Sequence, residues 1–241
     1  MSLLDTLDAR LKTLSETEFQ YIESNDINRA LELDHGCTGL YLEATVVYFE
    51  IKNPNFIIKE HGRRKMAQLH TMLHEVLVSI AEQDGAFVNC YSPSAFLIAY
   101  PGKENSMKKA VSGALKMVYA LTESFKSKFD LVSKMEFGMG LDHGHIMGTK
   151  TLLDHGFEQI TWFGSCIFKA ISVAKECGRP YYVGVSSIVY HNLDESLLIT
   201  TRRIIGIKKR IELWTKVTYQ YENVKKHLYQ TNHKINFEEA K

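Results

Sequence analysis

The stretch "TVVYFEIKNPNF", residues 45–56, has the pattern of a buried β-strand that ends on a single carboxylate. Valine, tyrosine and phenylalanine favour strands, and the Asn-Pro pair that soon follows Glu50 favours a turn. Metal and acid-base chemistry both use carboxylates at such positions, but they normally require a second acid nearby. The stretch therefore predicts the first strand of a sheet and raises the question of where a second acid lies.

The segment before this strand has the leucine spacing of an amphipathic helix. Leucines recur at helical intervals in residues 3–14, so that they line one face. Ser15, followed three residues later by Glu18, has the pattern of a capping box and predicts the start of a second short helix. We therefore expect an N-terminal helical segment over residues 1–37.

Two long helices and a hairpin are predicted after the first strand. Residues 56–85 carry apolar side chains on one face and stop at a glycine, as expected of one long amphipathic helix. Residues 86–102 predict two short strands bent at Pro93, since proline is poorly tolerated inside a central strand. Residues 106–128 predict a second long helix with small and apolar side chains inward.

The second half of the chain continues with strands around one more helix. Residues 134–148 predict a strand pair that pivots near Gly144, and residues 163–180 predict a helix that ends in a Gly-Arg-Pro segment. Residues 181–217 supply a strand, a short helix and two more strands. The sequence then turns polar, and residues 218–241 are expected to form a frayed helix or tail.

The order of these elements predicts the fold class. A strand, a helix, two strands, a helix and further strands indicate an α+β domain over residues 38–217. We expect a ferredoxin-like βαββαβ arrangement, with a mostly antiparallel sheet and helices packed on it.

Composition excludes several classes of protein. The chain has 241 residues, of which 45% are hydrophobic, and a formal net charge of +1, so no global field favours nucleic acid or an anionic membrane. No apolar run approaches the roughly 20 residues of a membrane-spanning helix. The four cysteines lie far apart without a CxxC pair, which favours a reducing compartment. We expect a cytoplasmic protein that binds neither nucleic acid nor membrane.

Two groups of histidines are candidate sites. His70, His74 and Glu75 lie at helical spacing and could present two imidazoles to a metal, but the HExxH order is absent, so partly exposed helix histidines are the favoured interpretation. His143 and His145 are expected on one face of a predicted strand, with Asp142 on the opposite face. We interpret them as polar residues at a hairpin tip.

Four stretches, taken in chain order, resemble the catalytic domain of class III nucleotidyl (adenylyl/guanylyl) cyclases. They are the strand that ends at Glu50, the glycine-led hairpin of residues 85–100, the Gly-x-Gly strand of residues 138–148 and the last core helix within residues 160–174. The resemblance covers about residues 45–217. The segment "NDI" at residues 25–27 is also similar to the bacterial pyrimidine cyclases of anti-phage signalling.

The resemblance implies an active site shared between two subunits. In the family, two aspartates hold two divalent ions that activate the ribose 3′-hydroxyl and neutralise the triphosphate. Glu50 occupies the place of the first aspartate and Ser94 that of the second, while Pro93 replaces a glycine. The metal site is at best half present. We expect no cofactor, and Mg²⁺ or Mn²⁺ only if activity remains.

The complementary half of the implied site has also changed. Cys90 lies where many members place a base-reading lysine, and Thr161 lies where another base-reading residue is usual. Phe168 replaces the asparagine that orients the ribose, and Ser172 replaces the arginine that stabilises the developing phosphoryl charge.

Further nucleotide contacts follow from the same resemblance. It places Phe49 and Ile51 in the nucleotide-binding region, together with Cys90 and Phe168. The phosphate-binding lysine would fall at about Ile205, and the nearby residues Lys208 and Lys209 are close enough in sequence to replace it.

Three functions remain open. The favoured one is a cyclase-like pseudoenzyme, working as a homodimer or in a heterodimer with an active relative, through its interface or as a sensor. The second is a divergent cyclase that uses Glu50 and an unidentified second metal ligand. The third is nucleotide binding without turnover in a more apolar cleft formed by Tyr91, Cys90 and Phe168.

Overall fold

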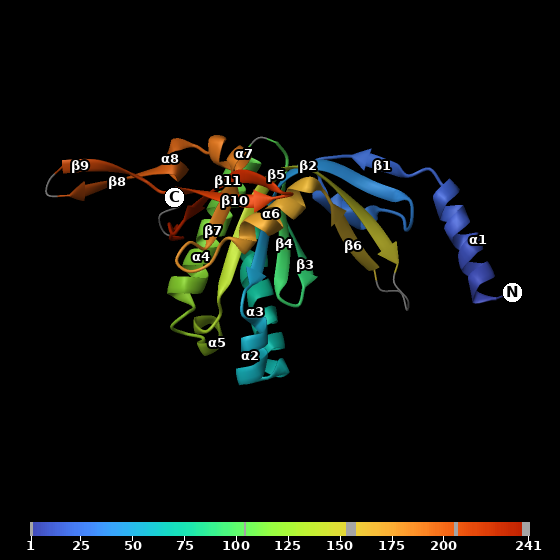
Figure 1. Ribbon diagram of the computed structural model, residues 1–241, viewed down its shortest axis with the longest axis horizontal. Helices are drawn as coiled ribbons and strands as arrows, with labels where there is room; N and C mark the ends of the chain where they lie inside the picture. The colour runs from blue at the N-terminus through green and yellow to red at the C-terminus, as the bar shows by residue number, and fades with distance from the viewer. Residues whose placement is uncertain (1, 104, 153–157, 205–206, 238–241) are drawn as a thin grey trace.

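The computed structural model describes residues 2–103, 105–152, 158–204 and 207–237. One sheet organises them, with the strand order β10-β11-β7-β5-β2-β4-β3, while β1 pairs with β2 and β6 pairs with β5 (Figure 1). The strands of this sheet are β1 (Gln20–Glu23), β2 (Thr38–Ile51), β3 (Phe87–Ser92), β4 (Ala95–Pro101), β5 (Phe137–Leu152), β6 (Glu158–Phe163), β7 (Val183–Ser186), β10 (Thr215–Tyr221) and β11 (Val224–Thr231). A separate two-stranded sheet joins β8 (Ile199–Ile204) to β9 (Ile207–Glu212).

Helices cover both faces of the large sheet. The α-helices are α1 (Leu3–Glu16), α2 (Pro54–His61), α3 (Arg63–Ala81), α4 (Ser106–Tyr119), α5 (Asp130–Ser133), α6 (Ser165–Lys175), α7 (Ser187–His191) and α8 (Glu195–Leu198). Short 3₁₀ segments lie at η1 (Ile27–Glu32) and η2 (Glu82–Asp84), and a π-helical turn, η3 (Ala120–Ser124), continues α4. No helix among the described residues is long and apolar enough to cross a membrane.

The ferredoxin-like arrangement is confirmed. The four strands β5-β2-β4-β3 lie side by side, and every neighbouring pair among them is antiparallel. In chain order they are joined through α3, the β3–β4 hairpin and α4, which is the βαββαβ order. β7 extends the sheet in parallel with β5.

Strand β2 explains why the sheet is a two-sided core. Val47, Phe49 and Ile51 pack in the cluster formed by α3 and α4, whereas Val46 and Tyr48 pack in the cluster that includes residues of α6 and η1. Side chains alternate between the two faces of a strand. A strand buried on both faces therefore has a nearly continuous apolar sequence, as this one does.

The N-terminal segment is helical only in part. The expected helix forms as α1, and a capping box between Ser2 and Asp5 begins it. The second helix predicted from Ser15 and Glu18 is wrong, because α1 continues through Glu16 and the chain then becomes β1. β1 runs parallel to the first residues of β2, so pairing with the sheet overrides the local capping signal.

The long helix predicted over residues 56–85 is two helices. Gly62 lies between α2 and α3 with φ of 82°, a conformation that glycine adopts without steric cost. The predicted inward face of α3 is otherwise found: Met66, Leu69, Leu73 and three further residues near its end are buried.

The strand pair predicted to pivot near Gly144 is one continuous strand, β5. Gly144 lies within this strand rather than at a turn, and a Cβ added there would lie 3.3 Å from the Cβ of Cys166 in α6. A Cβ at Gly140 would overlap the backbone of Ala170 and Ala174. These glycines therefore let α6 lie directly on β5.

The polar tail predicted over residues 218–241 is also wrong for its first half. β10 and β11 form a hairpin, and β11 joins the large sheet beside β7. The turn is made by Glu222 and Asn223, both with positive φ, as in the tight turns that suit the twist of a hairpin. Tyr219 and Leu228 are buried together with Val173 of α6 and Cys177. The mixture of polar and apolar residues in this segment therefore reflects strands with one buried face, not a frayed tail.

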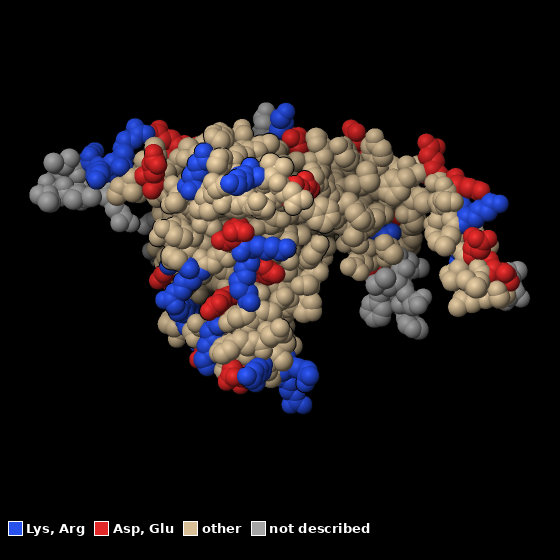
Figure 2. Space-filling view, in the orientation of Figure 1, with Lys and Arg blue, Asp and Glu red and all other residues tan. Residues whose placement is uncertain are grey.

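Charges of both signs are mixed on the surface. On the face shown in Figure 2, lysine and arginine side chains alternate with aspartate and glutamate. This distribution agrees with the formal net charge of +1.

The close approach of α6 to β5 generates the first prediction. Gly140→Ala should destabilise the protein by about 3 kcal/mol, because the new methyl group meets backbone atoms that cannot move independently. Gly178→Ala is the matched control, since a Cβ there has no atom within 4 Å. Urea unfolding measures both variants, and equal midpoints would contradict the packing described here.

Candidate functional site

The sheet brings Glu50 and the hairpin residue Ser94 together. Glu50 lies near the end of β2, opposite Ala95 of β4 and Gly138 of β5. The next residue, Ile51, donates its backbone N–H to the Ser94 carbonyl at 2.8 Å. The two positions predicted to correspond to a metal-binding pair are therefore neighbours in space.

The partner of Glu50 is the lysine that directly follows its strand. Lys52 Nζ lies 2.7 Å from Glu50 Oε2, and the two side chains are only 22% and 29% exposed. The Lys52 backbone N–H donates to the Glu136 carbonyl at 2.7 Å, which holds this residue at the end of the sheet where Glu50 lies. The question raised by the sequence has an answer: the second group at this site is a cation, not an acid.

Ser94 adds no charge to the site. Its backbone N–H donates to Ser92 Oγ at 3.3 Å, and its own Oγ lies 3.5 Å from Ser92 Oγ. Within the described part of the chain, no group of three or more His, Cys, Asp or Glu side chains is arranged to hold a metal ion. One carboxylate that is already paired, next to neutral hydroxyls, does not fit a pair of divalent ions.

Phe49 and Ile51 do not present their side chains to a ligand. Both are in the core, with exposures of 0% and 2%. The Phe49 ring stacks on Phe137, with the ring centroids 5.3 Å apart. Their predicted part in nucleotide binding therefore cannot involve these side chains.

Cys90 on β3 and Thr161 on β6 lie on strands that do not pair with each other but are linked by a side chain. Asn89 of β3 donates its side-chain amide to the Ile160 carbonyl of β6 at 3.1 Å, and this bond links the segments that carry Cys90 and Thr161. Cys90 is exposed, and its Sγ lies 3.5 Å from Nε2 of His70.

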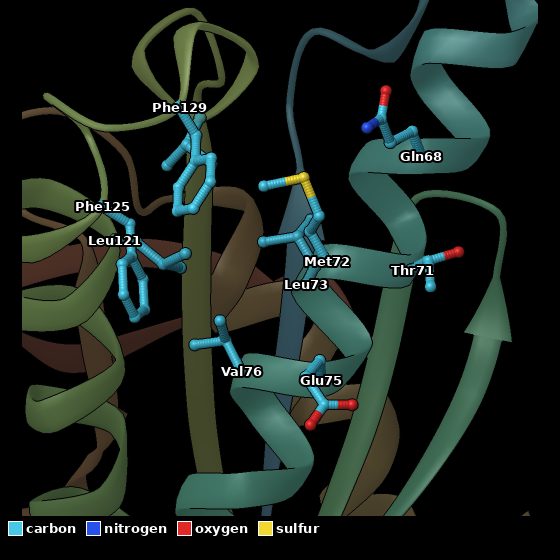
Figure 3. Close-up of a pocket in the computed structure, with 10 residues that line it drawn as sticks. Gln68, Thr71, Met72, Leu73, Glu75, Val76, Leu121, Phe125 and Phe129 are labelled. Carbon is cyan, nitrogen blue, oxygen red and sulfur yellow. The ribbon is translucent and has the colours of Figure 1, made fainter.

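The histidines of α3 do not form the metal site considered from the sequence. The His70 ring stacks on Phe96 at 4.8 Å, and the His74 ring is tilted against the same phenyl ring at 6.1 Å. Glu75 instead lines a groove of about 560 Å³ between α3 and the segment after α4, together with Met72 and Val76 (Figure 3).

The exposed face of α6 is apolar where the resemblance requires polar groups. Phe168 is 56% exposed. The Ser172 hydroxyl donates to the Phe168 carbonyl at 3.0 Å, one turn earlier in the same helix. One of the two lysines of this helix, Lys169, is directed to Asp142 of β5, 3.3 Å away.

The predicted phosphate-binding region lies away from the body of the domain. Ile205 is outside the described residues. Lys208 and Lys209 are exposed on β9, and the β8–β9 hairpin projects at one end of the long axis of the molecule, opposite α1 (Figure 1).

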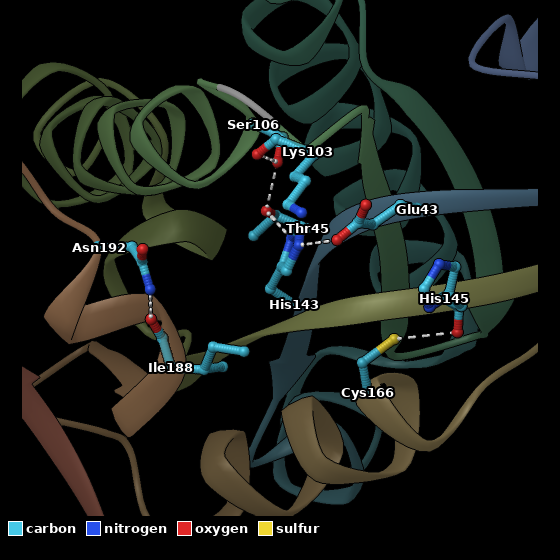
Figure 4. A network of polar contacts seen from close by, with 9 residues as sticks. All are labelled: Glu43, Thr45, Lys103, Ser106, His143, His145, Cys166, Ile188 and Asn192. Atoms are coloured by element: carbon cyan, nitrogen blue, oxygen red, sulfur yellow. Dashed lines mark hydrogen bonds and ion pairs between the residues drawn. The ribbon is translucent and has the colours of Figure 1, made fainter.

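The histidines of β5 belong to a polar network rather than to a hairpin tip. His143 Nδ1 lies 3.0 Å from Thr45 Oγ1, and its Nε2 lies 2.9 Å from Glu43 Oε1 (Figure 4). Thr45 also bonds to Ser106 of α4 at 2.9 Å. His145 is on the same face and stacks on Tyr41 at 5.1 Å.

Asp142 points to the opposite face of β5, as predicted from the alternation. It bonds to Ser186 and pairs with Lys169. Burial raises the pKa of the Asp142 carboxyl, and the Ser186 hydroxyl and the Lys169 ammonium oppose that shift. Both networks are internally paired, so they tie strands and helices together rather than forming an open site.

Similarity to known proteins lies in the structure rather than in the sequence. No protein-family model and no curated protein matches the chain. A bacterial light-regulated adenylyl cyclase matches with a TM-score of 0.64 and 12% identity over 98% of this chain, which spans 64% of that structure's length. A dimeric guanylyl cyclase domain from the fungus Blastocladiella emersonii matches with a TM-score of 0.56 and 15% identity, over 79% of this chain and 96% of its own.

A third structure is a class III adenylyl cyclase-like ATP-binding protein from Pseudomonas aeruginosa. It matches with a TM-score of 0.59 and 13% identity, over 80% of this chain and 44% of its own. This chain has the fold of a class III nucleotidyl cyclase domain. The cyclase fold was therefore predicted correctly from the four stretches, although the residues of its site differ.

Two contacts of this cyclase-like site were missed from the sequence: the pairing of Lys52 with Glu50 and that of His70 with Cys90. The contact of Lys52 could have been found, because this cation follows Glu50 by only two positions. His70 could not, because only the packing of α3 against the β3–β4 hairpin brings its ring to Cys90.

The Glu50–Lys52 pair generates the second prediction. Lys52→Met combined with Ser94→Asp should create Mn²⁺ binding at least about tenfold tighter than any shown by the wild type, because two free carboxylates replace an ion pair. Calorimetric titration with Mn²⁺ measures the change.

Each single substitution is a control for the double variant. Lys52→Met alone leaves one carboxylate, and Ser94→Asp alone leaves the ammonium in place. Equally tight Mn²⁺ binding by the wild-type protein would show that Lys52 does not occupy the site.

Proposed function

We propose that this protein is a catalytically inactive nucleotidyl-cyclase-like domain that acts as a dimerising regulatory or nucleotide-sensing module. The observation that supports this proposal most strongly is the ion pair between Lys52 and Glu50. It neutralises the one carboxylate at the position where a cyclase needs two acids and two divalent ions.

Electrostatic reasoning supports the loss of catalysis. An ammonium 2.7 Å from Glu50 repels a divalent cation from the same oxygen. Removal of a single electrostatic donor from an active site typically costs about 10²–10³ in rate. Here a neutral serine, Ser94, stands at the position of the second acid, and another, Ser172, stands at the position of the arginine. Charged groups are therefore lost from both halves of the site.

Exposed aromatic side chains at positions that the resemblance places around the nucleotide favour binding without turnover. Tyr91 is 45% exposed and lies edge-on to Tyr48, with the ring centroids 5.4 Å apart. Burial, followed by the Glu50 carboxylate, raises the pKa of Tyr48 to about 12, so Tyr48 remains a neutral phenol. Exposed rings such as Tyr91 and Phe168 offer stacking surfaces to a base. An ATP-binding protein with this fold supports such a role.

The third prediction concerns activity. Purified protein should make no cyclic product from ATP, GTP, CTP or UTP with Mg²⁺ or Mn²⁺, because neither the metal pair nor the arginine is present. Chromatography of the products measures this. Thermal unfolding with the same nucleotides is the companion measurement, and a nucleotide that raises Tm without being converted supports sensing.

Glu50→Ala is the reference for background contamination in that assay. Product formed by the wild type above the level of this variant would contradict the inactive-domain proposal. It would favour a divergent cyclase that uses Glu50 with another ligand.

Dimerisation is supported by apolar side chains left uncovered. Phe163 and Phe168 flank the start of α6 and are 52% and 56% exposed. In α1, leucines 4, 7, 11 and 14 are spaced by three and four residues, the pattern of a coiled-coil seam, and each is at least 43% exposed. A second copy of the chain would cover both surfaces by two-fold pairing. The dimeric fungal domain of the same fold supports this arrangement.

The fourth prediction tests the dimer. Sedimentation at roughly tens of micromolar, a concentration that detects weak interfaces, should show a dimer. Leu7→Ser with Leu11→Ser should increase the dissociation constant at least about tenfold, by removing buried leucines from the seam. Lys12→Ser with Thr13→Ser is the matched control on the side of α1 opposite the seam. A wild-type monomer at this concentration would contradict homodimerisation.

A further inference from the structure

A thiol and an imidazole meet where α3 packs on the β3–β4 hairpin. Cys90, on β3, is exposed and free, and its Sγ lies 3.5 Å from Nε2 of His70 on α3. The other ring nitrogen of His70, Nδ1, lies 3.1 Å from the carbonyl oxygen of Pro93. A nucleophile, a base and a group that orients the base are the three parts of an activated thiol.

The contact with Pro93 determines which nitrogen of His70 can act as a base. A carbonyl oxygen only accepts hydrogen bonds, so Nδ1 must carry the proton that it donates to Pro93. In the neutral ring, Nε2 then has a free lone pair. That lone pair faces Cys90 Sγ, so the imidazole is placed to accept the thiol proton.

The base is held in a fixed orientation. The His70 ring stacks on the ring of Phe96, with centroids 4.8 Å apart and an interplanar angle of 21°. Phe96 is fully buried in β4. Packing against a core aromatic, together with the Pro93 bond, limits rotation of the imidazole and keeps it directed at the sulfur.

The other three cysteines are in different surroundings. Cys166 and Cys177 are buried, and burial raises the pKa of each thiol to about 12. Cys37 is half-buried, with the Leu14 carbonyl 3.9 Å from its Sγ. A carbonyl also lies near Cys90, at Ser92 and 3.6 Å away, but an oxygen of that kind cannot remove a proton. Cys90 thus differs from the other cysteines in having a base.

We propose that Cys90, activated by His70, is a redox modification site that forms mixed disulfides with low-molecular-weight disulfides such as oxidised glutathione. The inference does not depend on the proposed function, since it rests on the thiol, the imidazole and their exposure. The adduct would lie at the position where the resemblance places base recognition, so that it would also obstruct that position.

The step is a thiol–disulfide exchange without net oxidation. His70 takes the proton from Cys90, and the thiolate attacks one sulfur of the disulfide. A new bond forms between Cys90 and that sulfur while the original bond between the two small-molecule sulfurs breaks. The departing thiolate leaves with the electron pair and takes the proton back from the imidazolium of His70.

The experiment compares labelling rates in the full-length protein. Each cysteine is followed by peptide mass spectrometry during reaction with iodoacetamide and, separately, with oxidised glutathione at pH 7. Cys90 should react at least about tenfold faster than glutathione itself reacts with iodoacetamide in the same buffer. His70→Gln should slow the Cys90 reaction with both reagents by at least about tenfold, because the base is lost.

Two features of the chain supply controls. His74→Gln changes a histidine one turn further along α3, whose ring lies against Phe96 rather than beside the Cys90 thiol, and the Cys90 rate should not change. Cys166 and Cys177 should remain unlabelled in every variant, which shows within the same sample that the variant is folded. Cys90→Ser should abolish the fast reaction entirely.

Two results would overturn the proposal. In one, Cys90 of the folded wild-type protein reacts no faster than free glutathione. In the other, Cys90 reacts rapidly but His70→Gln leaves its rate unchanged while the buried cysteines stay protected, so that exposure alone explains the reactivity. Whether or not the protein binds a nucleotide has no bearing on either of these two results.

Discussion

Strand β2 is hydrogen-bonded to β4 and β5 along Ala44 to Glu50 and is covered by helices on both faces. A strand confined in this way cannot slip by one residue without turning its apolar side chains to the wrong layer. The directions of the residues at its end are therefore fixed as well. Glu50 is held in this register, and Lys52, the residue directly after the strand, pairs with its carboxylate.

The same reasoning explains which features of a cyclase fold persist in this chain. Gly140 is required because α6 backbone lies where a side chain would be, and the apolar residues of β2 are required by two packed layers. These requirements apply to an inactive domain as much as to an active one. The resemblance assigns the positions of a second carboxylate, an asparagine and an arginine, which serve chemistry alone, to Ser94, Phe168 and Ser172.

The elements predicted well from the sequence are those whose periodicity reflects burial: β2, the β3–β4 hairpin, α4 and α6. The errors fall where tertiary contacts decide. Gly144 has the local signal of a turn but serves the approach of α6, and Ser15 has the signal of a helix start, although the following residues pair with β2. The C-terminal hairpin depends on two residues with positive φ, Glu222 and Asn223, which were read as part of a polar tail.

Helix α1 contributes no buried residue, and the chain that follows it is held by the pairing of β1 with Thr38 to Tyr41 of β2. β2 then runs without interruption to Glu50 and Ile51. An extended strand is stiff along its axis, because its length is already close to the limit of the backbone. A pull on α1 would therefore be transmitted through β1 along the whole length of β2. The strand would connect the N-terminal helix mechanically to the end of the sheet where Glu50 lies.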